Sequence, residues 1–278
     1  MKKNKLSGVY YKAAPTLLNK QLEGAFLHDK GPGELPGKVG RGKVKGLIVP
    51  FEEYDVSGPC SAWAYKALAE AKKPDVVVIV GQVESGAYSC MESFETPFGI
   101  ARVDQKLVRK LKNVKIDESL FDSDIFVESQ LPFLQFLFGR GRTISFVPLL
   151  VGPDAGIREL VVDLKEVLLD EGKEGVVIAP TNFTKHGPNY SYLPFSDGIN
   201  KKVYEHDGGA LDLIKKGDVK KYLEYYHGHG MNTDNYLGVI FALLFAKPTK
   251  ALLEQYYTSA DVNGDVKNLV SFASIVLK

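Results

Sequence analysis

The sequence predicts an α/β fold: a single three-layer α/β/α domain, with helices on both faces of a mostly parallel or mixed central sheet. Two observations carry this prediction. Apolar runs of strand length alternate along the chain with segments of helical period. Several of these runs are rich in valine and isoleucine without alternating polar residues, as in "DVVVIVG", which is typical of strands covered on both faces.

The expected elements follow in order along the chain. The apolar runs, most of which stop at glycine or proline or at a polar segment, predict strands at 46–51, 75–81, 99–104, 143–152, 175–180 and 270–278. The longer periodic segments predict helices at 14–28, 60–73, 104–112, 128–138, 157–171, 200–216, 219–227, 232–246 and 249–258. In the segment 157–171 apolar residues recur every three or four positions, so this helix should bury a single stripe.

The domain organisation rests on one glycine-rich stretch, residues 29–45. It lies inside the first strand-forming unit and not between two halves, so one domain is expected over residues 1–278. Its glycines precede a strand, whereas the glycines of a dinucleotide-binding fingerprint follow one. A surface loop is therefore expected there.

Composition excludes two classes of partner. Lys and Arg number 35 against 34 Asp and Glu, a net charge of +1, so the basic footprint of a nucleic-acid binder is missing. The longest apolar stretch, 237–246, is far shorter than the roughly 20 residues that a membrane span needs. Cys60 and Cys90 are too few for a disulfide framework or a structural zinc site, so a cytoplasmic protein is expected.

Polar residues come directly after three of the predicted strands. These segments read "PFEEYDVSGP" from residue 50, "GQVESG" from residue 81 and "PTNFTKHGPNYSY" from residue 180. Ligands of open α/β sheets bind outside the carboxyl ends of the strands, so a site is expected here. The segments mostly lack the histidine, aspartate and cysteine set that would hold a metal or a nucleophile.

Longer blocks of the chain resemble the Memo family. They read "SGVYYKAAPTLLNKQLEGAF", "PFEEYDVSGPCSAWAYKAL", "VVIVGQVESG", "FETPFGIARVDQKL", "ESQLPFLQF", "FVPLLVG" and "YYTSADVNGDVKNLVSFAS". They occur in the family's order over nearly the whole chain. The resemblance implies a single α/β domain similar in fold to class III extradiol ring-cleaving dioxygenases, which carry a non-haem iron.

The same resemblance implies a degenerate active site. The family's metal and nucleophile positions are occupied by Phe51, Glu84, Ile125, Asn182, Lys185 and the segment Met231–Asn232, and only Glu128 is kept. Phenylalanine and isoleucine offer a metal no donor atom. The resemblance therefore favours a non-catalytic protein with no cofactor.

A pocket rim remains at these positions. Its predicted members are Phe51, Tyr54, Ser57, Glu84, Glu95, Thr96, Glu128, Asn182, Lys185, His186 and Asn232. They suit a small polar or anionic ligand with Lys185 supplying the charge, and a protein partner is a further expectation. For Glu84 two readings stay open, a functional carboxylate and a structural salt bridge to Lys185.

A divergent metal-dependent oxidoreductase is the competing prediction. His186 lies one position past the family histidine, so a one-residue slip would group it with Glu84 and Glu128. That set suits iron or manganese, with copper as a further alternative. His227 and His229 in "YYHGHG" also look like a metal pair, but such alternation with glycine is more typical of a flexible turn.

Overall fold

The computed structural model describes residues 1–139 and 145–278. Its main sheet contains β1 (Gly46–Val49), β2 (Val76–Gln82), β3 (Ala87–Ser89), β6 (Lys115–Ile116), β7 (Ser145–Val151), β8 (Gly175–Pro180), β9 (Lys185–His186), β10 (Ala251–Thr258) and β11 (Leu269–Leu277). The order is β10-β11-β1-β8-β2-β7-β3-β6, with β9 paired to β11. The four central strands β1, β8, β2 and β7 are parallel, whereas β10, β11 and β1 pair antiparallel. The sheet is therefore mixed.

A second, two-stranded sheet is formed by β4 (Phe94–Thr96) and β5 (Gly99–Ala101). It contains residues 99–101 of the strand predicted at 99–104. Residues 143 and 144 of the strand predicted at 143–152 lie outside the described residues, and β7 covers the rest up to residue 151.

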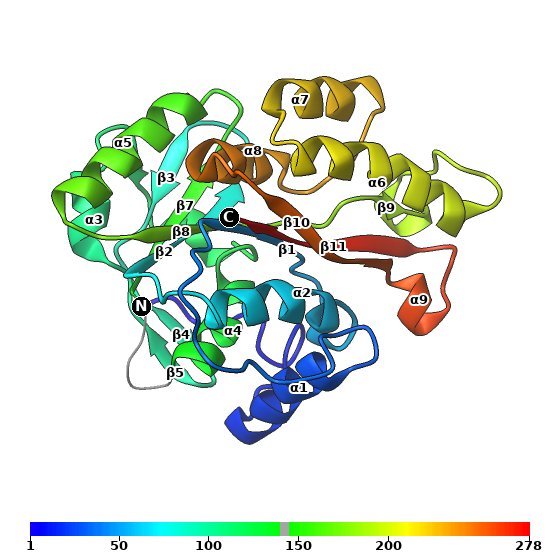
Figure 1. Cartoon of the computed structure of the whole chain (residues 1–278), viewed down its shortest axis with the longest axis horizontal. Coiled ribbons are helices and arrows are strands. Elements are labelled where there is room, and N and C mark those ends of the chain that lie inside the picture. Colours follow the sequence, from blue (N-terminus) through cyan, green and yellow to red (C-terminus); the bar gives the residue numbers. More distant parts are fainter. Residues whose placement is uncertain (140–144) are drawn as a thin grey trace.

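Helices cover both faces of the main sheet (Figure 1). They are α1 (Pro15–Leu27), α2 (Tyr54–Ala69), α3 (Gln105–Lys110), α4 (Leu131–Phe138), α5 (Ile157–Asp170), α6 (Ile199–Lys215), α7 (Val219–Gly228), α8 (Tyr236–Ala246) and α9 (Ala260–Asn263), with short 3-10 turns η1 (Ser119–Asp122), η2 (Glu128–Gln130) and η3 (Pro188–Tyr190). On one face α2 packs on β11, β10 and β1, with α1 and α4 outside it. On the other face α8 packs on β8, β1 and β2, and α5 and α7 pack against α8. These contacts confirm the three-layer prediction.

Burial explains the sequence patterns of the central elements. Residues 76–80 of β2 are all buried, as the uninterrupted apolar run predicted. Helix α8 is apolar on nearly every side because it lies between the sheet and other helices. Helix α5 buries one stripe against the core and turns the rest outward, as its periodicity predicted.

Two helix predictions need correction. The segment 249–258 is not a helix but forms β10, which pairs with β11 along its length. Its local spacing of apolar residues fits a helix, and only the long-range pairing makes it a strand. Helix α2 begins at Tyr54 and not near residue 60, because the helix continues through Ser57, Gly58 and Pro59, which look like a turn in the sequence.

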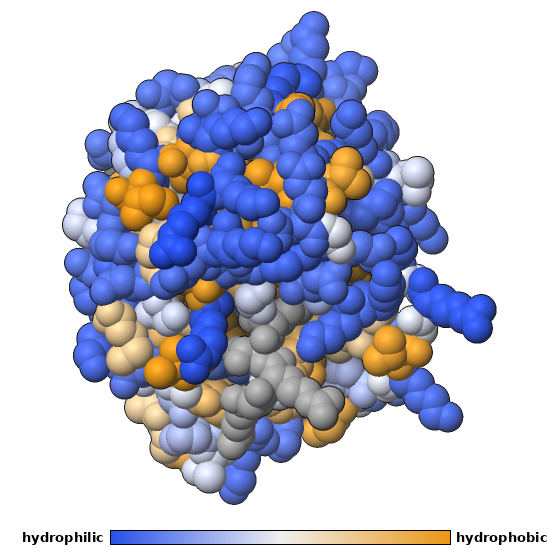
Figure 2. Space-filling model, turned by 90° about the vertical axis from the view of Figure 1, so that its left-hand side faces the viewer, coloured by the Kyte–Doolittle hydropathy of each residue, from blue (hydrophilic) through white to orange (hydrophobic). Residues whose placement is uncertain are grey.

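The surface on the left of Figure 1 is shown facing the viewer in Figure 2. Outside the grey residues it is largely hydrophilic, and its hydrophobic residues occur in small scattered groups, which is normal for a protein surface. Within residues 1–139 and 145–278, no helix is both long enough and apolar enough to cross a membrane.

Candidate functional site

The candidate site lies where the parallel strands end. Phe51 follows β1, Asn182 follows β8, and Asp234 precedes α8. The backbone N–H of Phe51 donates to Asn182 Oδ1 at 3.3 Å, and the N–H of Asp234 donates to the Asn182 carbonyl at 3.2 Å. The buried Asn182 thus joins three segments that are far apart in the sequence, at the sheet edge where ligands of such folds bind.

Four side chains form what we call the carboxylate–lysine cluster: Glu52, Asn182, Lys185 and Asp234. Asn182 Nδ2 donates to Glu52 Oε1 at 3.0 Å and to Asp234 Oδ2 at 3.2 Å. Lys185 Nζ lies 2.6 Å from Asp234 Oδ1. When both carboxylates are ionised, two negative charges face one positive charge, so the cluster has a net charge of −1.

Burial is the main influence on the carboxylates of this cluster. It raises the pKa of Glu52, and the charge of Lys185 offsets this only in part because Asp234 and Glu53 act in the opposite direction. Burial also raises the pKa of Asp234 in spite of its ion pair with Lys185. For the nearby Tyr10, burial and then the charges of Glu52 and Asp234 raise the pKa to about 12. Lys185 alone therefore does not compensate the negative charges of Glu52 and Asp234.

A pocket of about 480 Å³ opens beside the cluster. Its described lining consists of Gln82, Val83, Glu84, Leu120, Ser123, Asp124, Ile125, Phe126, Leu150 and Asp234. Five of these residues make an apolar wall, three carry carboxylates, and none of the described lining residues is basic. Asp234 belongs both to the pocket and to the cluster, so the two form one continuous site.

Asp124 sets the charge of the pocket near neutral pH. Burial raises its pKa to about 7, although its carboxylate accepts the backbone N–H groups of Val127 and Phe126 at 2.8 and 3.3 Å. The pocket therefore gains negative charge as the pH rises through that value.

Comparison with known proteins shows similarity along nearly the whole chain. A family model described as Memo-like protein matches residues 2–276. The chain belongs to the Memo family. A MEMO1 family protein of Methanopyrus kandleri is 30% identical over 98% of this chain and 97% of its own length. A MEMO1 family protein of Sulfolobus acidocaldarius is 30% identical over 97% of this chain and 96% of its own length.

A solved structure supports the fold alone. An uncharacterized protein from Escherichia coli K12 has a TM-score of 0.54 and 14% sequence identity, and the match covers 85% of this chain and 100% of that chain. The α/β fold of this Memo family protein is also consistent with the relationship to class III extradiol dioxygenases that the sequence motifs implied.

Most of the positions that the resemblance assigned to the family's metal site lie at or beside this pocket. Glu84 and Ile125 line it, and Asn182 and Lys185 reach it through Asp234. Phe51 is buried, and its ring meets the ring of Phe126 edge to face with centroids 4.9 Å apart. In this Memo family protein an aromatic pair therefore occupies the first of the positions that the resemblance assigned to the metal site.

Glu128, the one residue kept from the family pattern, has a different surrounding. It is buried, and its carboxylate accepts the backbone N–H groups of Lys5 and Leu6 at 3.0 and 2.8 Å and the hydroxyl of Tyr11 at 2.6 Å. Glu128 thus fixes the N-terminal segment to the rest of the domain.

Two other predicted rim residues support the frame of the site. Tyr54 is buried, and its hydroxyl donates to the Ser129 carbonyl at 2.5 Å. Ser57 Oγ donates to the Glu52 carbonyl at 2.7 Å, which fixes the loop that carries Glu52.

Asn232 sets the position of Lys185. Its Oδ1 accepts the backbone N–H of Lys185 at 3.1 Å, and its Nδ2 donates to the Lys185 carbonyl at 2.7 Å. His186, the next residue, is buried in β9, where its Nε2 lies 3.0 Å from the Phe195 carbonyl. The side chain of Asn232 is therefore engaged with the backbone of β9.

Glu95 and Thr96 have partners elsewhere. Glu95 pairs with Lys3 at 3.0 Å, and Thr96 Oγ1 lies 2.6 Å from Gln135 Oε1. Both contacts lie in or beside the two-stranded sheet, and neither residue lines the pocket.

The alternative metal set is not assembled. Within the described ranges, no three His, Cys, Asp or Glu side chains are grouped as a metal ion requires. Glu84, Glu128 and His186 lie in three separate surroundings. His227 packs near Tyr236 with ring centroids 6.0 Å apart, whereas His229 stacks on Tyr225 at 3.8 Å. The residues present therefore do not fit a non-haem iron or a similar ion.

Of the two readings left open for Glu84, the salt bridge to Lys185 is not formed. Glu84 is exposed at the pocket mouth, and the partner of Lys185 is Asp234. Asp234 and Asp124 were missed by the sequence analysis. Their place in the sequence was a signal for both, because each lies close to a position assigned by the family motifs. Asp124 directly precedes Ile125, and Asp234 follows the segment 231–232.

Proposed function

We propose that this Memo family protein is a non-catalytic binding protein whose pocket takes a small ligand with an amine or another cationic group. One observation carries the proposal. The pocket presents Glu84, Asp124 and Asp234, and none of its described lining residues is basic. The anion expected from the sequence needs a free Lys185, but this lysine is paired with Asp234 at 2.6 Å.

The electrostatics favour a cation. Burial raises the pKa of Glu52, Asp234 and Asp124, so each carboxylate lacks part of the positive charge that would compensate it. A bound cation would supply that charge in a partly buried place, where charges interact more strongly than in bulk water. The apolar wall of the pocket would cover the hydrocarbon part of such a ligand.

The non-catalytic part of the proposal rests on the side chains at the family's metal positions. Phe51 is packed against Phe126, and Ile125 is apolar, so neither offers a donor atom. Asn182 uses its amide to hold Glu52, Asp234 and the backbone of Phe51. These residues support a binding role better than a redox role.

Calorimetric titration with two sets of probes tests the proposal. The cations are methylammonium, guanidinium, agmatine and spermidine, and the anions are acetate, phosphate and citrate. We expect saturable binding of at least one cation, weakened roughly 5- to 10-fold in Glu84→Gln, because one nearby charge contributes about 1 kcal/mol. Glu224→Gln removes a carboxylate from α7 and should leave the affinity unchanged.

Two results would contradict the proposal. Binding of an anion that is lost in Lys185→Met would support the original expectation of a lysine-bound anion. Near-stoichiometric iron, manganese or copper in protein purified without chelator, measured by elemental mass spectrometry, would support the metal-dependent oxidoreductase.

A further inference from the structure

One half of the outer edge of β10 is open. Strand β10 ends the sheet and pairs only with β11 in the described part of the chain. Lys250 and Lys278 exchange two backbone hydrogen bonds, at 2.9 and 3.4 Å. Because bonded and non-bonded pairs alternate in an antiparallel ladder, the backbone groups of Ala251 and Leu253 point away from β11.

The second half of this edge is closed by side chains. The outward N–H of Tyr256 donates to Gln255 Oε1 at 2.9 Å, and the N–H of Thr258 donates to Asp261 Oδ2 at 2.7 Å. A β-bulge between Leu253 and Gln255 separates this half from the first. Bulges and side-chain caps are the usual means of preventing strand addition, so the first half, residues 251–253, is the open part.

The open part is complementary to itself. We propose that β10 pairs antiparallel with β10 of a second copy about a two-fold axis at Leu252, which makes the protein a homodimer. This register places Ala251 opposite Leu253 of the second copy, so the outward N–H and C=O groups of both residues are used. The backbone ladder ends at Leu253, so the bulge residue Glu254 contributes only its side chain to the contact.

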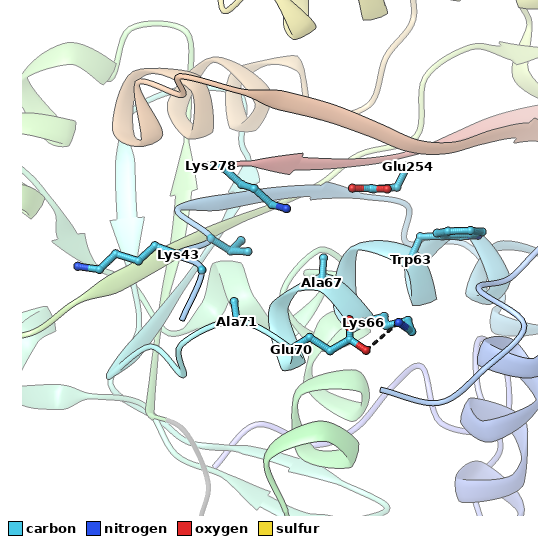
Figure 3. Close-up of a pocket in the computed structure, with 10 residues that line it drawn as sticks. Lys43, Trp63, Lys66, Ala67, Glu70, Ala71, Glu254 and Lys278 are labelled. Atoms are coloured by element: carbon cyan, nitrogen blue, oxygen red, sulfur yellow. Dashed lines mark hydrogen bonds and ion pairs between the residues drawn. The ribbon is translucent and has the colours of Figure 1, made fainter. Parts of the chain in front are cut away.

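Charge complementarity supports the same register. About an axis at Leu252, Lys250 lies opposite Glu254 of the second copy, and the pair occurs twice. Neither residue takes part in an ion pair within residues 1–139 and 145–278. Glu254 extends from β10 toward α2, near Trp63, at a pocket of about 320 Å³ (Figure 3). Lys66, the lysine of α2 at this pocket, is already paired with Glu70 at 2.7 Å and with Glu34 at 3.1 Å.

The two-fold arrangement also sets the size of the assembly. A symmetric contact uses the same edge on both copies, so the interface closes at two chains. It leaves residues 251–253 of neither copy open to a third chain. The contact joins two main sheets without covering the candidate site, which lies at the ends of β1, β2 and β8.

Analytical ultracentrifugation tests the proposal over about 1 to 100 µM protein, the range in which dimers of modest affinity dissociate. The wild-type chain should show a reversible monomer–dimer equilibrium. Lys250→Glu and Glu254→Lys each place like charges opposite one another twice, so each should weaken the dimer roughly 10-fold or more. The double variant Lys250→Glu/Glu254→Lys restores opposite charges and should restore the dimer.

A backbone variant tests the hydrogen bonds separately. Leu253→Pro removes an outward N–H that makes no bond to β11, so it should abolish the dimer, with circular dichroism and the melting temperature checking that the chain still folds. A wild-type chain that stays monomeric over the whole range would overturn the proposal. So would a dimer that is equally strong in both single charge variants and in the double variant.

Discussion

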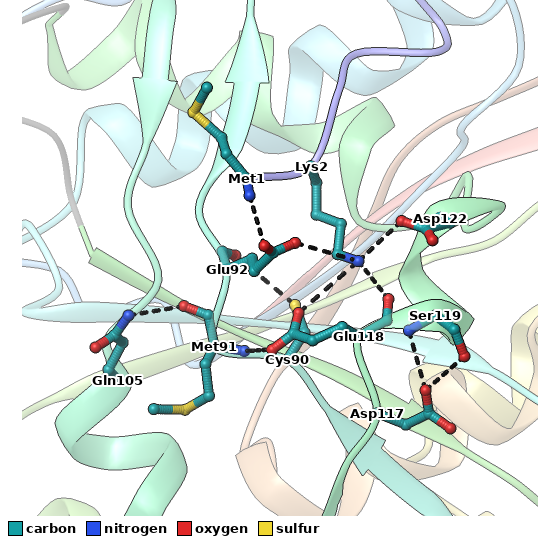
Figure 4. A network of polar contacts seen from close by, with 10 residues as sticks. All are labelled: Met1, Lys2, Cys90, Met91, Glu92, Gln105, Asp117, Glu118, Ser119 and Asp122. Carbon is teal, nitrogen blue, oxygen red and sulfur yellow. Dashed lines mark hydrogen bonds and ion pairs between the residues drawn. The ribbon is translucent and has the colours of Figure 1, made fainter.

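Two clusters in this molecule are each built around a lysine, and they differ in how the carboxylates are compensated. At the N-terminus Lys2 is 5% exposed, and its Nζ lies 2.8 Å from Asp122, 3.4 Å from Glu92 and 3.8 Å from Glu118 (Figure 4). The Met1 amino group adds a second positive charge at 2.6 Å from Glu92. In the carboxylate–lysine cluster, Lys185 alone faces Asp234 and Glu52.

The pKa values show the consequence. The hydrogen bond from Lys2 lowers the pKa of Asp122, and the hydrogen bond from the Met1 amino group lowers the pKa of Glu92. Both carboxylates lie at the surface, so little desolvation opposes the effect. Burial raises the pKa of Glu52 and Asp234 instead. The positive charges of the N-terminal cluster therefore favour the ionised carboxylates, whereas burial disfavours ionisation in the carboxylate–lysine cluster.

The largest expected effect is the loss of stability when Glu128 is removed. It would show that Glu128 supports the fold and does not belong to the candidate site. Glu128→Ala leaves the backbone N–H groups of Lys5 and the buried Leu6 and the Tyr11 hydroxyl without an acceptor, and should lower the free energy of unfolding by roughly 3 to 5 kcal/mol. Urea unfolding measures this, with Glu84→Gln as a control that should change it by less than about 0.5 kcal/mol. Unchanged stability with loss of ligand binding would instead place Glu128 in the site.

A smaller loss is expected at the N-terminal cluster. Lys2→Met should lower the free energy of unfolding by roughly 2 kcal/mol at neutral pH, because the Glu118 carbonyl and the Asp122 carboxylate lose their buried donor. The carboxylates have lowered pKa values in the folded state, so their contribution is present above the ordinary pKa and is lost as the pH falls through the lowered values. The difference between the two proteins should therefore shrink at acid pH, and a constant difference would disprove the electrostatic cause.

Lys185→Met should have two opposite effects. Removing the only positive charge of the cluster should cost roughly 1 kcal/mol of stability at pH 8, since Asp234 and Glu52 stay partly buried without it. The same change should strengthen cation binding about 3- to 10-fold, because the pocket becomes more negative. Calorimetry measures the affinity, and Lys201→Met on α6 serves as the control. Weaker cation binding in Lys185→Met would contradict the role assigned to the cluster.

The smallest expected effect is a gain of stability in Glu52→Gln, whereas Lys2→Met should lose stability. Glu52→Gln keeps the Oε1 acceptor for Asn182 and removes a partly buried charge, so it should stabilise the protein by roughly 0.5 to 1 kcal/mol at pH 8. The folded-state pKa is raised, so the cost of ionisation appears as the pH rises above the ordinary value of 4.5 and through the raised value. The gain should vanish near pH 4. A loss of stability at pH 8 would mean that Glu52 is well compensated.

Much of the fold could be predicted from sequence because its central elements have strong local patterns. The uninterrupted run of β2 and the single stripe of α5 each indicate both the element and its burial. The helix predicted at 249–258 failed because an edge strand buries little on either face, so its sequence lacks a clear period of two. The start of α2 was misplaced because Pro59 is accommodated within the helix.

The sequence by itself determined the Memo family membership, the three-layer fold and the absence of metal donors at Phe51 and Ile125. It did not reveal which charges face one another, because Glu52, Lys185 and Asp234 are far apart in the chain and meet only where β1 and β8 end. Burial and distance depend on the folded chain, and they decide whether a lysine is free or paired. Only the tertiary structure therefore showed that Lys185 is neutralised by Asp234 and that the pocket beside it is acidic.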